Sequence, residues 1–282
     1  TLKMNKVLVC LDGSEFSKAV CDYGIFIAKN LNLPLVLLNV IEHSKISNIV
    51  DFSGNIGLGE KDELLEMLVD EDAKRSQEQI SKGKAILKQM QEYVKSKDFS
   101  NFTTLQRHGT LYETLDELSS DLKIAIIGLF GENSKDIGSN VEELIRTLNI
   151  PILLVNSEFK PIKSILMAYD GSFYAKKSID VALKNPIFPN IKRYIVNVNS
   201  DKNESHRILN EASFIFKSAN IDSETLSLSG EKLESILDYQ KSINADIITM
   251  GAYSHNRFKS AIFGSFTTNM ILKSKVPLLL FR

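Results

Sequence analysis

The sequence predicts an α/β protein built from two tandem copies of one parallel-sheet domain. The first observation is an internal repeat, because KVLVCLDGS at Lys6–Ser14 returns as SILMAYDGS at Ser164–Ser172. A second repeat supports the first, since IAIIG at Ile124–Gly128 corresponds to IITMG at Ile247–Gly251. The third observation is the length of 282 residues, which suits two compact domains that each have their own core.

Strand-like and helix-like segments alternate through the second half. Short apolar and β-branched runs predict strands, and apolar residues at helical spacing predict helices. In order, the expected elements are a strand at Ile165–Tyr169, a helix at Ser172–Leu183, a strand at Tyr194–Val198, a helix at Glu204–Ala219, a strand at Glu224–Leu228, a helix at Leu233–Ile243, a strand at Asp246–Met250, a helix at Thr267–Leu272 and a strand at Pro277–Phe281. This order predicts parallel strands with helices on both faces, and the poor alternation within Glu224–Leu228 places that strand at an edge.

The first half follows the same order with an added segment of about residues 44–97. After a strand at Val36–Ile41, a loop rich in small and polar residues at Ser44–Gly59 leads into a long charged helix from about Glu60 to Lys97. Gly83 is a candidate interruption of that helix. We expect the segment to pack over one face of the sheet, with a lid or a dimerisation arm as the alternative.

The two domains are predicted at residues 3–156 and 161–282, with a short link at Asn156–Lys160. Each ends in a short apolar strand, Ile152–Val155 and Leu278–Phe281, which would leave an exposed sheet edge if it were bare. These strands are therefore predicted to pair, so that the halves form an intrachain pseudo-dimer. A homodimer of whole chains is a further option that no residue pattern demands.

Charge and hydropathy exclude several classes of protein. Thirty-four basic and thirty-five acidic side chains give a formal charge of −1, which does not favour nucleic-acid or membrane-surface binding. The apolar runs are too short to span a bilayer, and no leader pattern is visible, so a cytoplasmic location is expected. Cys10 and Cys21 lack C-x-x-C spacing and the four histidines are scattered, so we expect no metal site.

An Asp-Gly-Ser turn follows the first strand of each copy. It places Asp12 or Asp170 at the carboxyl edge of the sheet, which is where ligands bind in open α/β folds. The following serine, Ser14 or Ser172, can cap the next helix. A turn that serves only to join strand to helix explains the same residues equally well.

A glycine-bearing loop near the C-terminus is more specific. Gly251-Ala-Tyr-Ser254 is separated by nine residues from Gly264-Ser265-Phe266-Thr267, and Arg257 and Lys259 lie between them. Glycines allow close approach of the backbone to a ligand, and the N–H groups at a helix start favour an anion. These features predict a triphosphate site, with a serine-capped surface loop as the structural alternative.

The first copy departs from this pattern. Six residues separate Gly131 from Gly138 in place of nine, and Glu132 and Asp136 bring negative charge where phosphate would lie. Triphosphate binding is therefore predicted mainly for the C-terminal half.

On these motifs the whole chain resembles the universal stress protein family in its tandem form. The resemblance implies a Rossmann-like, adenine nucleotide alpha hydrolase-like fold with strand order 3-2-1-4-5. It also implies binding of ATP, which can carry Mg, with the adenosine near Asp170, the adenine near Val198 and the phosphates near the glycine loop. The site residues carried over are Ala168, Tyr169, Asp170, Val198, Gly251, Ser254, Gly264, Ser265, Phe266 and Thr267. Ser254 departs from the family pattern, which has glycine there.

The leading hypothesis is a stress-response protein that binds ATP as a regulatory or structural ligand. One alternative is a nucleotide-free interaction module in which both sites are degenerate. Another is a slow ATP hydrolase, although no P-loop, nucleophile elbow or general base is visible and no catalytic residue is named.

Overall fold

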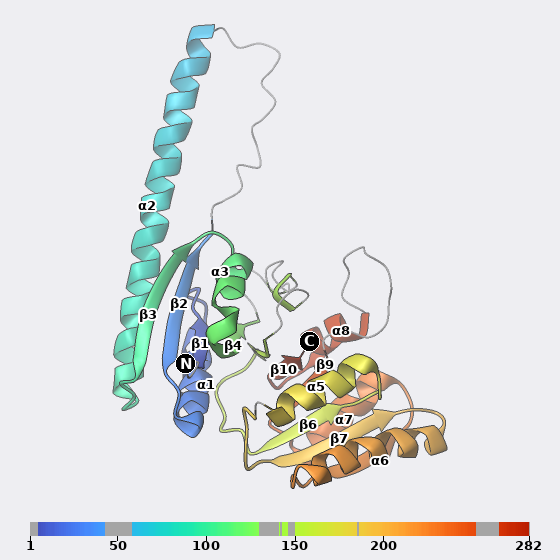
Figure 1. Ribbon diagram of the computed structural model, residues 1–282. Coiled ribbons are helices and arrows are strands. Elements are labelled where there is room, and N and C mark those ends of the chain that lie inside the picture. Colours follow the sequence, from blue (N-terminus) through green and yellow to red (C-terminus); the bar gives the residue numbers. More distant parts are fainter. Residues whose placement is uncertain are drawn as a thin grey trace.

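The strands of both halves form one continuous ten-stranded sheet (Figure 1). The computed structural model describes residues 5–42, 58–129, 141, 143–145, 150–184, 186–251 and 265–281, and for 58–72 and 174 it describes the backbone only. The strands are β1 (Lys6–Cys10), β2 (Leu35–Ile41), β3 (Phe102–His108), β4 (Leu122–Gly128), β5 (Ile152–Val155), β6 (Ser164–Ala168), β7 (Lys192–Val198), β8 (Glu224–Leu228), β9 (Ile247–Gly251) and β10 (Leu278–Phe281). The helices are α1 (Ser17–Leu31), α2 (Leu58–Ser96), α3 (Leu111–Leu118), the short η1 (Ser119–Asp121), α5 (Phe173–Lys184), α6 (Lys202–Ser218), α7 (Lys232–Ile243) and α8 (Ser265–Lys273).

The strand order is β3-β2-β1-β4-β5-β10-β9-β6-β7-β8. Each half therefore has the order 3-2-1-4-5, with parallel pairing throughout. β5 and β10 pair antiparallel, with Leu153 opposite Leu279, and this pair joins the halves. The elements predicted for the second half are all present, and β8 lies at a sheet edge as predicted.

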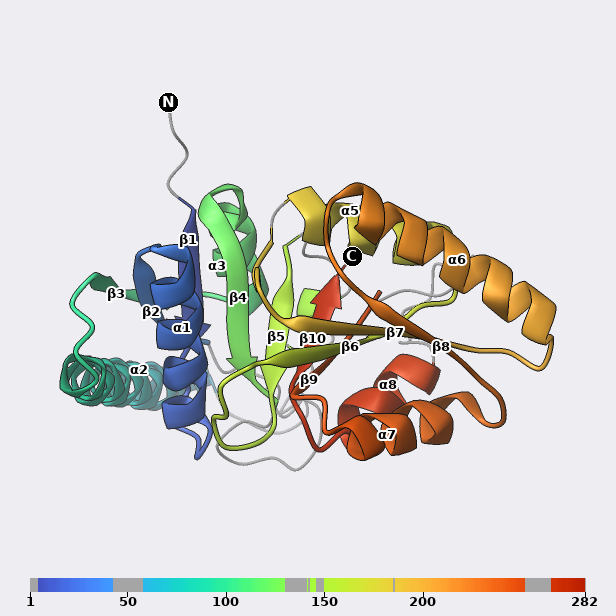
Figure 2. The same ribbon diagram turned by 90° about the horizontal axis from the view of Figure 1, so that it is seen from below.

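Helices cover both faces of the sheet. In the second half, α5 and α6 lie on one side of the strands and α7 and α8 on the other (Figure 2). One buried cluster combines residues of α3, α7 and α8 with strands of both halves, and a second combines α1 and α2 with strands of both halves. The two predicted repeats thus share their hydrophobic cores across the β5–β10 junction.

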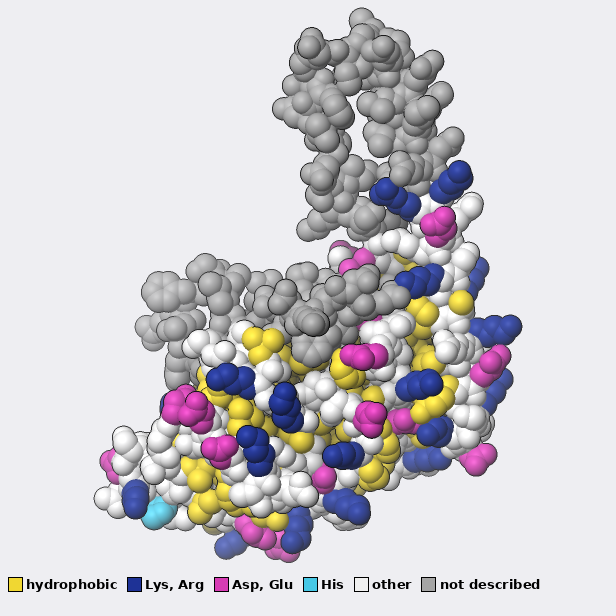
Figure 3. All heavy atoms as spheres, turned by 180° about the vertical axis from the view of Figure 1, so that it is seen from behind, with side chains coloured by type: hydrophobic (Ala, Val, Ile, Leu, Met, Phe, Trp, Pro, Cys, Tyr) yellow, Lys and Arg dark blue, Asp and Glu magenta, His cyan; other side chains and the backbone are white. Residues whose placement is uncertain are grey.

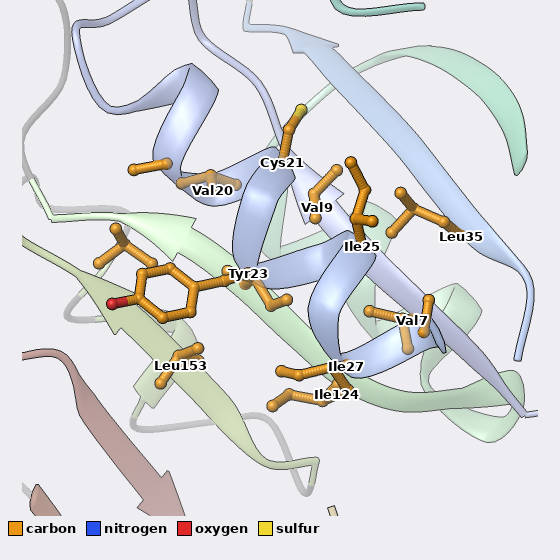
Figure 4. Close-up of a cluster of buried hydrophobic side chains, with 14 of the residues drawn as sticks. Val7, Val9, Val20, Cys21, Tyr23, Ile25, Ile27, Leu35, Ile124 and Leu153 are labelled. Carbon is orange, nitrogen blue, oxygen red and sulfur yellow. The ribbon is translucent and has the colours of Figure 1, made fainter. Parts of the chain in front are cut away.

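Helix α1 shows how the spacing of apolar residues along a helix determines which side of it packs on the sheet. Val20, Tyr23 and Ile27 lie at helical spacing and are almost completely buried. They pack with strand residues of β1, β2, β4 and β5, of which Val7, Val9, Leu35, Ile124 and Leu153 are labelled in Figure 4. The helix ends at Asn32, whose left-handed backbone (φ 53°) lets its N–H reach the carbonyls of Ala28 and Lys29.

Helix α2 is an ordinary crossover helix with an extension at its N-terminal end. Its later turns are equivalent to α6 at an offset of 122 residues in the sequence. The evidence is that Ile86 of α2 lies against Gly13, and Ile208 of α6 lies against Gly171, the glycine of the second Asp-Gly-Ser turn. At the same offset, α6 corresponds to α2 from Ile80 to Ser96. The additional helix is therefore Leu58–Gln79, which Figure 1 shows projecting beyond the sheet. The predicted loop at Ser44–Gly59 lies largely outside the described residues.

Gly83 does not interrupt α2, contrary to the expectation from sequence. The helix is continuous through it, and Gly83 is buried against the side chains of Asn39 and Gln106. A Cβ at this position would overlap the amide groups of both residues. The glycine is therefore explained by close packing of helix on sheet rather than by a helix break.

The link between the halves, Asn156–Lys160, makes contacts with both of them. The Phe159 ring packs edge-on against Tyr23 of α1 at 4.8 Å between centroids, and the Lys160 N–H donates to the Tyr23 hydroxyl at 3.3 Å. Asn156 Nδ2 donates to the carbonyl of Ser274, just after α8, at 2.9 Å. These contacts hold the link in one path over the surface.

Surface charge is mixed. Figure 3 shows basic and acidic side chains interspersed over the described part of one face. Among the described residues, no helix is both long and apolar enough to cross a membrane.

Replacing Gly83 with valine should lower the free energy of unfolding by about 1–3 kcal/mol, because the new side chain overlaps Asn39 and Gln106. Lys84→Val is the matched control, since Lys84 is exposed on the same helix and its replacement should cost no more than about 0.5 kcal/mol. Urea denaturation followed by circular dichroism measures both. Equal losses in the two variants would contradict the close packing at Gly83.

Candidate functional site

Each half has a cavity at the carboxyl ends of its central strands. In both halves it lies where the strand order reverses, beside β1 and β4 or beside β6 and β9, which is the usual place for a ligand in an open α/β sheet. The cavity of the second half measures about 140 Å³. Its lining comprises Ala168, Tyr169, Asp170, Ser172, Ala175, Val196, Asn197, Val198, Lys232, Ile236, Met250, Gly251, Phe266 and Thr267.

Most of the residues singled out from the sequence meet in this second cavity. Seven of them line it, namely Ala168, Tyr169, Asp170, Val198, Gly251, Phe266 and Thr267. They come from the ends of three strands and from the first turn of α8, which begins at Ser265. Ser254 and Gly264 lie outside the described residues.

The Asp-Gly-Ser turn has the same geometry in both copies. Asp170 Oδ1 accepts a hydrogen bond from the Ser172 N–H at 2.9 Å, and Asp12 Oδ1 accepts one from the Ser14 N–H at the same distance. The intervening glycines have φ values of +73° and +85°, a left-handed backbone that favours glycine. The turn uses one oxygen of each carboxylate, and both aspartates are exposed.

The serine of the turn caps a helix in one copy only. Ser172 Oγ accepts from the Ala175 N–H at 3.2 Å, as predicted. Ser14 does not cap α1, because that helix begins later, at Ser17, with Phe16 in the capping position. The Ser14 hydroxyl is buried without a partner among the described residues.

Sequence reasoning missed a buried asparagine at each cavity. Asn39 and Asn197 are 6% and 4% exposed and occupy equivalent places in β2 and β7. Nδ2 of each donates at 2.8 Å to a carbonyl at the end of the neighbouring strand, that of Leu11 or of Tyr169. The available signal was a polar residue at the same place in two otherwise apolar strands, Leu38-Asn39-Val40 and Val196-Asn197-Val198.

Tyr169 differs from its counterpart Leu11 in carrying a buried hydroxyl. The residue is 3% exposed, and its hydroxyl has no partner among the described residues. Burial, reinforced by the nearby charges of Glu211 and Asp170, raises the pKa of Tyr169 to about 12. The phenol is therefore neutral at physiological pH and can donate a hydrogen bond.

The cavity of the first half is larger, at about 400 Å³, and α2 forms one wall. Gln79, Lys82, Gly83 and Ile86 of α2 face a strand-end lining that includes Cys10. Asp12 and Glu42 also line it, so its described charges are two carboxylates and one ammonium group. In the second cavity, Asp170 and Lys232 are the corresponding charges, one of each sign.

Both cavities suit binding of a small molecule. Apolar walls with a few converging polar groups are typical of ligand sites. Within the described part of the chain, no group of three or more His, Cys, Asp or Glu side chains is arranged to hold a metal ion.

The fold and these cavities define a tandem, Rossmann-like α/β protein with one cavity at the switch point of each half. The universal stress protein family matches residues 3–156 and 200–282. The chain belongs to the universal stress protein family.

Known proteins resemble the chain in sequence and in fold. A universal stress protein of Synechocystis sp. is 29% identical over 287 residues, covering 99% of this chain and 100% of that protein. The stress response protein NhaX of Bacillus subtilis is 26% identical over 154 residues, covering 53% of this chain and 90% of its own. The crystal structure of a universal stress protein from Archaeoglobus fulgidus shares the fold, with a TM-score of 0.70 at 18% identity and coverage of 99% and 97%.

Both cysteines should resist alkylation in the native protein. Burial, together with the charge of Asp12, raises the pKa of Cys10, and burial with the charge of Asp22 raises the pKa of Cys21 to about 12. At about pH 8, where an ordinary thiol is already partly ionised, neither should present the reactive thiolate. Iodoacetamide labelling read by mass spectrometry should find no label on the native chain and two labels in concentrated guanidinium chloride. Rapid labelling of native Cys10, which is only partly buried, would contradict its raised pKa.

Proposed function

We propose that this protein binds an adenine nucleotide in the cavity of its C-terminal half and acts in a cytoplasmic stress response, with ATP as a regulatory or structural ligand. The observation that carries the proposal is the convergence of seven sequence-predicted residues on one cavity at the switch point. These residues come from separate strands and one helix, so their meeting is a property of the fold and not of any single segment.

The lining suits the parts of a nucleotide. Val198, Ile236 and Met250 give apolar walls for a base. The exposed Asp170 can accept hydrogen bonds from ribose hydroxyls. The first turn of α8 offers backbone N–H groups, together with the hydroxyls of Ser265 and Thr267, to phosphate. A magnesium ion would enter the site bound to the triphosphate, so it would need no ligand from the chain.

Charge favours the second half over the first, although the first cavity is larger. In the first cavity a triphosphate would lie near two carboxylates, Asp12 and Glu42, and one ammonium group, that of Lys82. In the second cavity Asp170 is balanced by Lys232. The loop sequences add Glu132 and Asp136 to the first half and Arg257 and Lys259 to the second. Nearby charge of the wrong sign weakens anion binding at a helix start, so the nucleotide should prefer the second half.

We also propose that residues 3–156 and residues 161–282 are two domains that pair within one chain as the two subunits of a homodimer would. The antiparallel β5–β10 pairing supports this, because two copies of one domain pair through the same strand.

Replacing Asp170 with alanine should weaken ATP binding about tenfold or more, because a charged acceptor for ribose is lost. Asp12→Ala is the matched control, since it removes the same turn hydrogen bond at the same distance in the other half. Calorimetric titration of ATP-Mg into nucleotide-stripped wild type and both variants measures the difference, and Asp12→Ala should leave the affinity nearly unchanged.

Absence of binding heat in the wild type, or a loss confined to Asp12→Ala, would overturn the proposal. The first result favours a nucleotide-free interaction module. Release of ADP from the bound ATP at a steady rate favours the slow hydrolase instead of a binding protein.

A further inference from the structure

We propose that two copies of this chain associate through antiparallel pairing of their α2 helices, along the face of α2 that the rest of the chain leaves exposed. The partner of this surface is therefore a second copy of the same protein. The described residues of this face line neither cavity, so the pairing does not depend on nucleotide binding.

Two sides of α2 are occupied within the chain. Leu87 is buried on the sheet, and the Tyr93 hydroxyl donates to Asp22 of α1 at 2.7 Å. Lys84 comes nine residues before Tyr93, which is about two and a half helical turns, so it lies on the opposite side of α2 from α1. Figure 2 shows α2 at one end of the molecule, with α1 on its inner side.

An exposed line of residues at helical spacing runs along this free side. We call it the outer face of α2, and its described members over the later turns are Gln77, Ser81, Lys84, Lys88 and Lys95. The ammonium groups of Lys84 and Lys88 have no ion-pair partner among the described residues, and Glu92, one turn beyond Lys88, forms no ion pair with it. The outer face is therefore basic where α2 covers the sheet.

The same spacing leads to acidic positions in the part of α2 that projects beyond the sheet. Continuing from Gln77 toward the N-terminus, it passes Ala73 and then reaches Asp70, Glu66 and Glu63. Charge along this one line is thus separated, with acidic residues in the extension and basic residues in the later turns.

This separation of charge is unfavourable for a helix on its own. Lys84 and Lys88 are four residues apart, as are Glu66 and Asp70, and like charges at that spacing destabilise a helix. The helix dipole favours acidic residues in the first turn and basic residues in the last, whereas Asp70 and Lys84 lie well inside α2. Opposite charges from outside the chain would relieve both repulsions.

A second α2 in antiparallel orientation supplies those charges in register. With a twofold axis at Gln77, positions equally far from it on the two chains lie opposite each other. Lys84 then lies opposite Asp70, seven residues from the axis, and Lys88 lies opposite Glu66, eleven residues from it. Symmetry repeats both pairs, so the paired helices have four contacts between opposite charges.

The centre of the paired faces carries no charge that opposes close approach. Ala73 and Ser81 lie four residues on either side of Gln77, so they lie opposite each other in the same register. All three are exposed, and the two outer residues are small. Two helices can therefore come together at this point without burying a charge.

The second half of the chain provides an internal comparison. Helix α6 is the counterpart of the later turns of α2 and has no extension. At the offset of 122 residues, exposed His206 and Asn210 replace Lys84 and Lys88. The lysine pair thus occurs on the helix that also carries the acidic extension. An RNA or an anionic membrane would attract the lysines but would be repelled by Asp70 and Glu66, whereas a second α2 uses both.

Sedimentation velocity of the full chain at several concentrations tests this pairing. The wild type should dimerise at low salt, and the affinity should fall at least about fivefold between about 0.05 M and about 0.5 M NaCl, because exposed ion pairs are screened. Lys84→Glu combined with Lys88→Glu should weaken the dimer at least about tenfold, since four attractive contacts become repulsive. Lys202→Glu combined with Lys217→Glu is the matched control, because it makes the same charge change on exposed residues of α6 and should leave the dimer unchanged.

A charge exchange separates pairing of these faces from a defect in folding. Glu66→Lys combined with Asp70→Lys should also abolish the dimer when this variant is alone. Mixing it with the Lys84→Glu, Lys88→Glu variant should restore a dimer, because each altered face then meets opposite charge on the other chain. A folding defect would not be repaired by mixing.

Three results would overturn the proposal. The first is a wild type that stays monomeric at low salt and high concentration, and the second is a dimer that persists unchanged in both charge variants. The third is a mixture of the two variants that remains monomeric. Binding of single-stranded RNA or of anionic vesicles by a wild type that is monomeric would assign the lysines to that partner instead.

Discussion

The antiparallel pairing of β5 with β10 is the contact on which the rest of the molecule depends. All side chains of both strands are buried, so either strand alone would expose an apolar edge with unpaired backbone groups. Their union makes one sheet and lets two hydrophobic clusters run through both halves. Because the link also packs on Tyr23, the halves are held in one relative position, and so are their cavities.

The copies keep a common framework and differ in a few side chains that surround each cavity. The aspartate turn and the asparagine-to-carbonyl bond have the same hydrogen-bond lengths in both. Tyr169 replaces Leu11, and Ser227 replaces Gln106. These exchanges alter which polar atoms are satisfied internally, while both halves keep the same strand order. Two sites of different chemistry can therefore share one architecture.

Helix α2 shows how a repeated fold accommodates added residues. The extra turns extend an existing crossover helix at its N-terminal end, beyond the sheet. Its later turns keep the packing of α6, with Leu87, Met90 and Val94 buried as Leu209, Ala212 and Phe216 are. Gly83 lets α2 lie close to β2 and β3. As a result α2 forms one wall of the first cavity, whereas no described residue of α6 lines the second cavity.

The sequence by itself determined the repeat, the alternation of strands and helices, and the strand-end residues that line the second cavity. These follow from local periodicity and short motifs, which place residues such as Asp170 and Gly251 at one edge of a parallel sheet. The tertiary structure alone decided the role of Gly83, the size of the first cavity and the partners of Asn39 and Asn197. Both asparagines sit in nearly identical strands, and what distinguishes them is a donor on a neighbouring strand and a residue on the covering helix, dozens of residues away along the chain. Hydrogen-bond satisfaction in a core depends on which groups meet in space, and no local pattern contains that information.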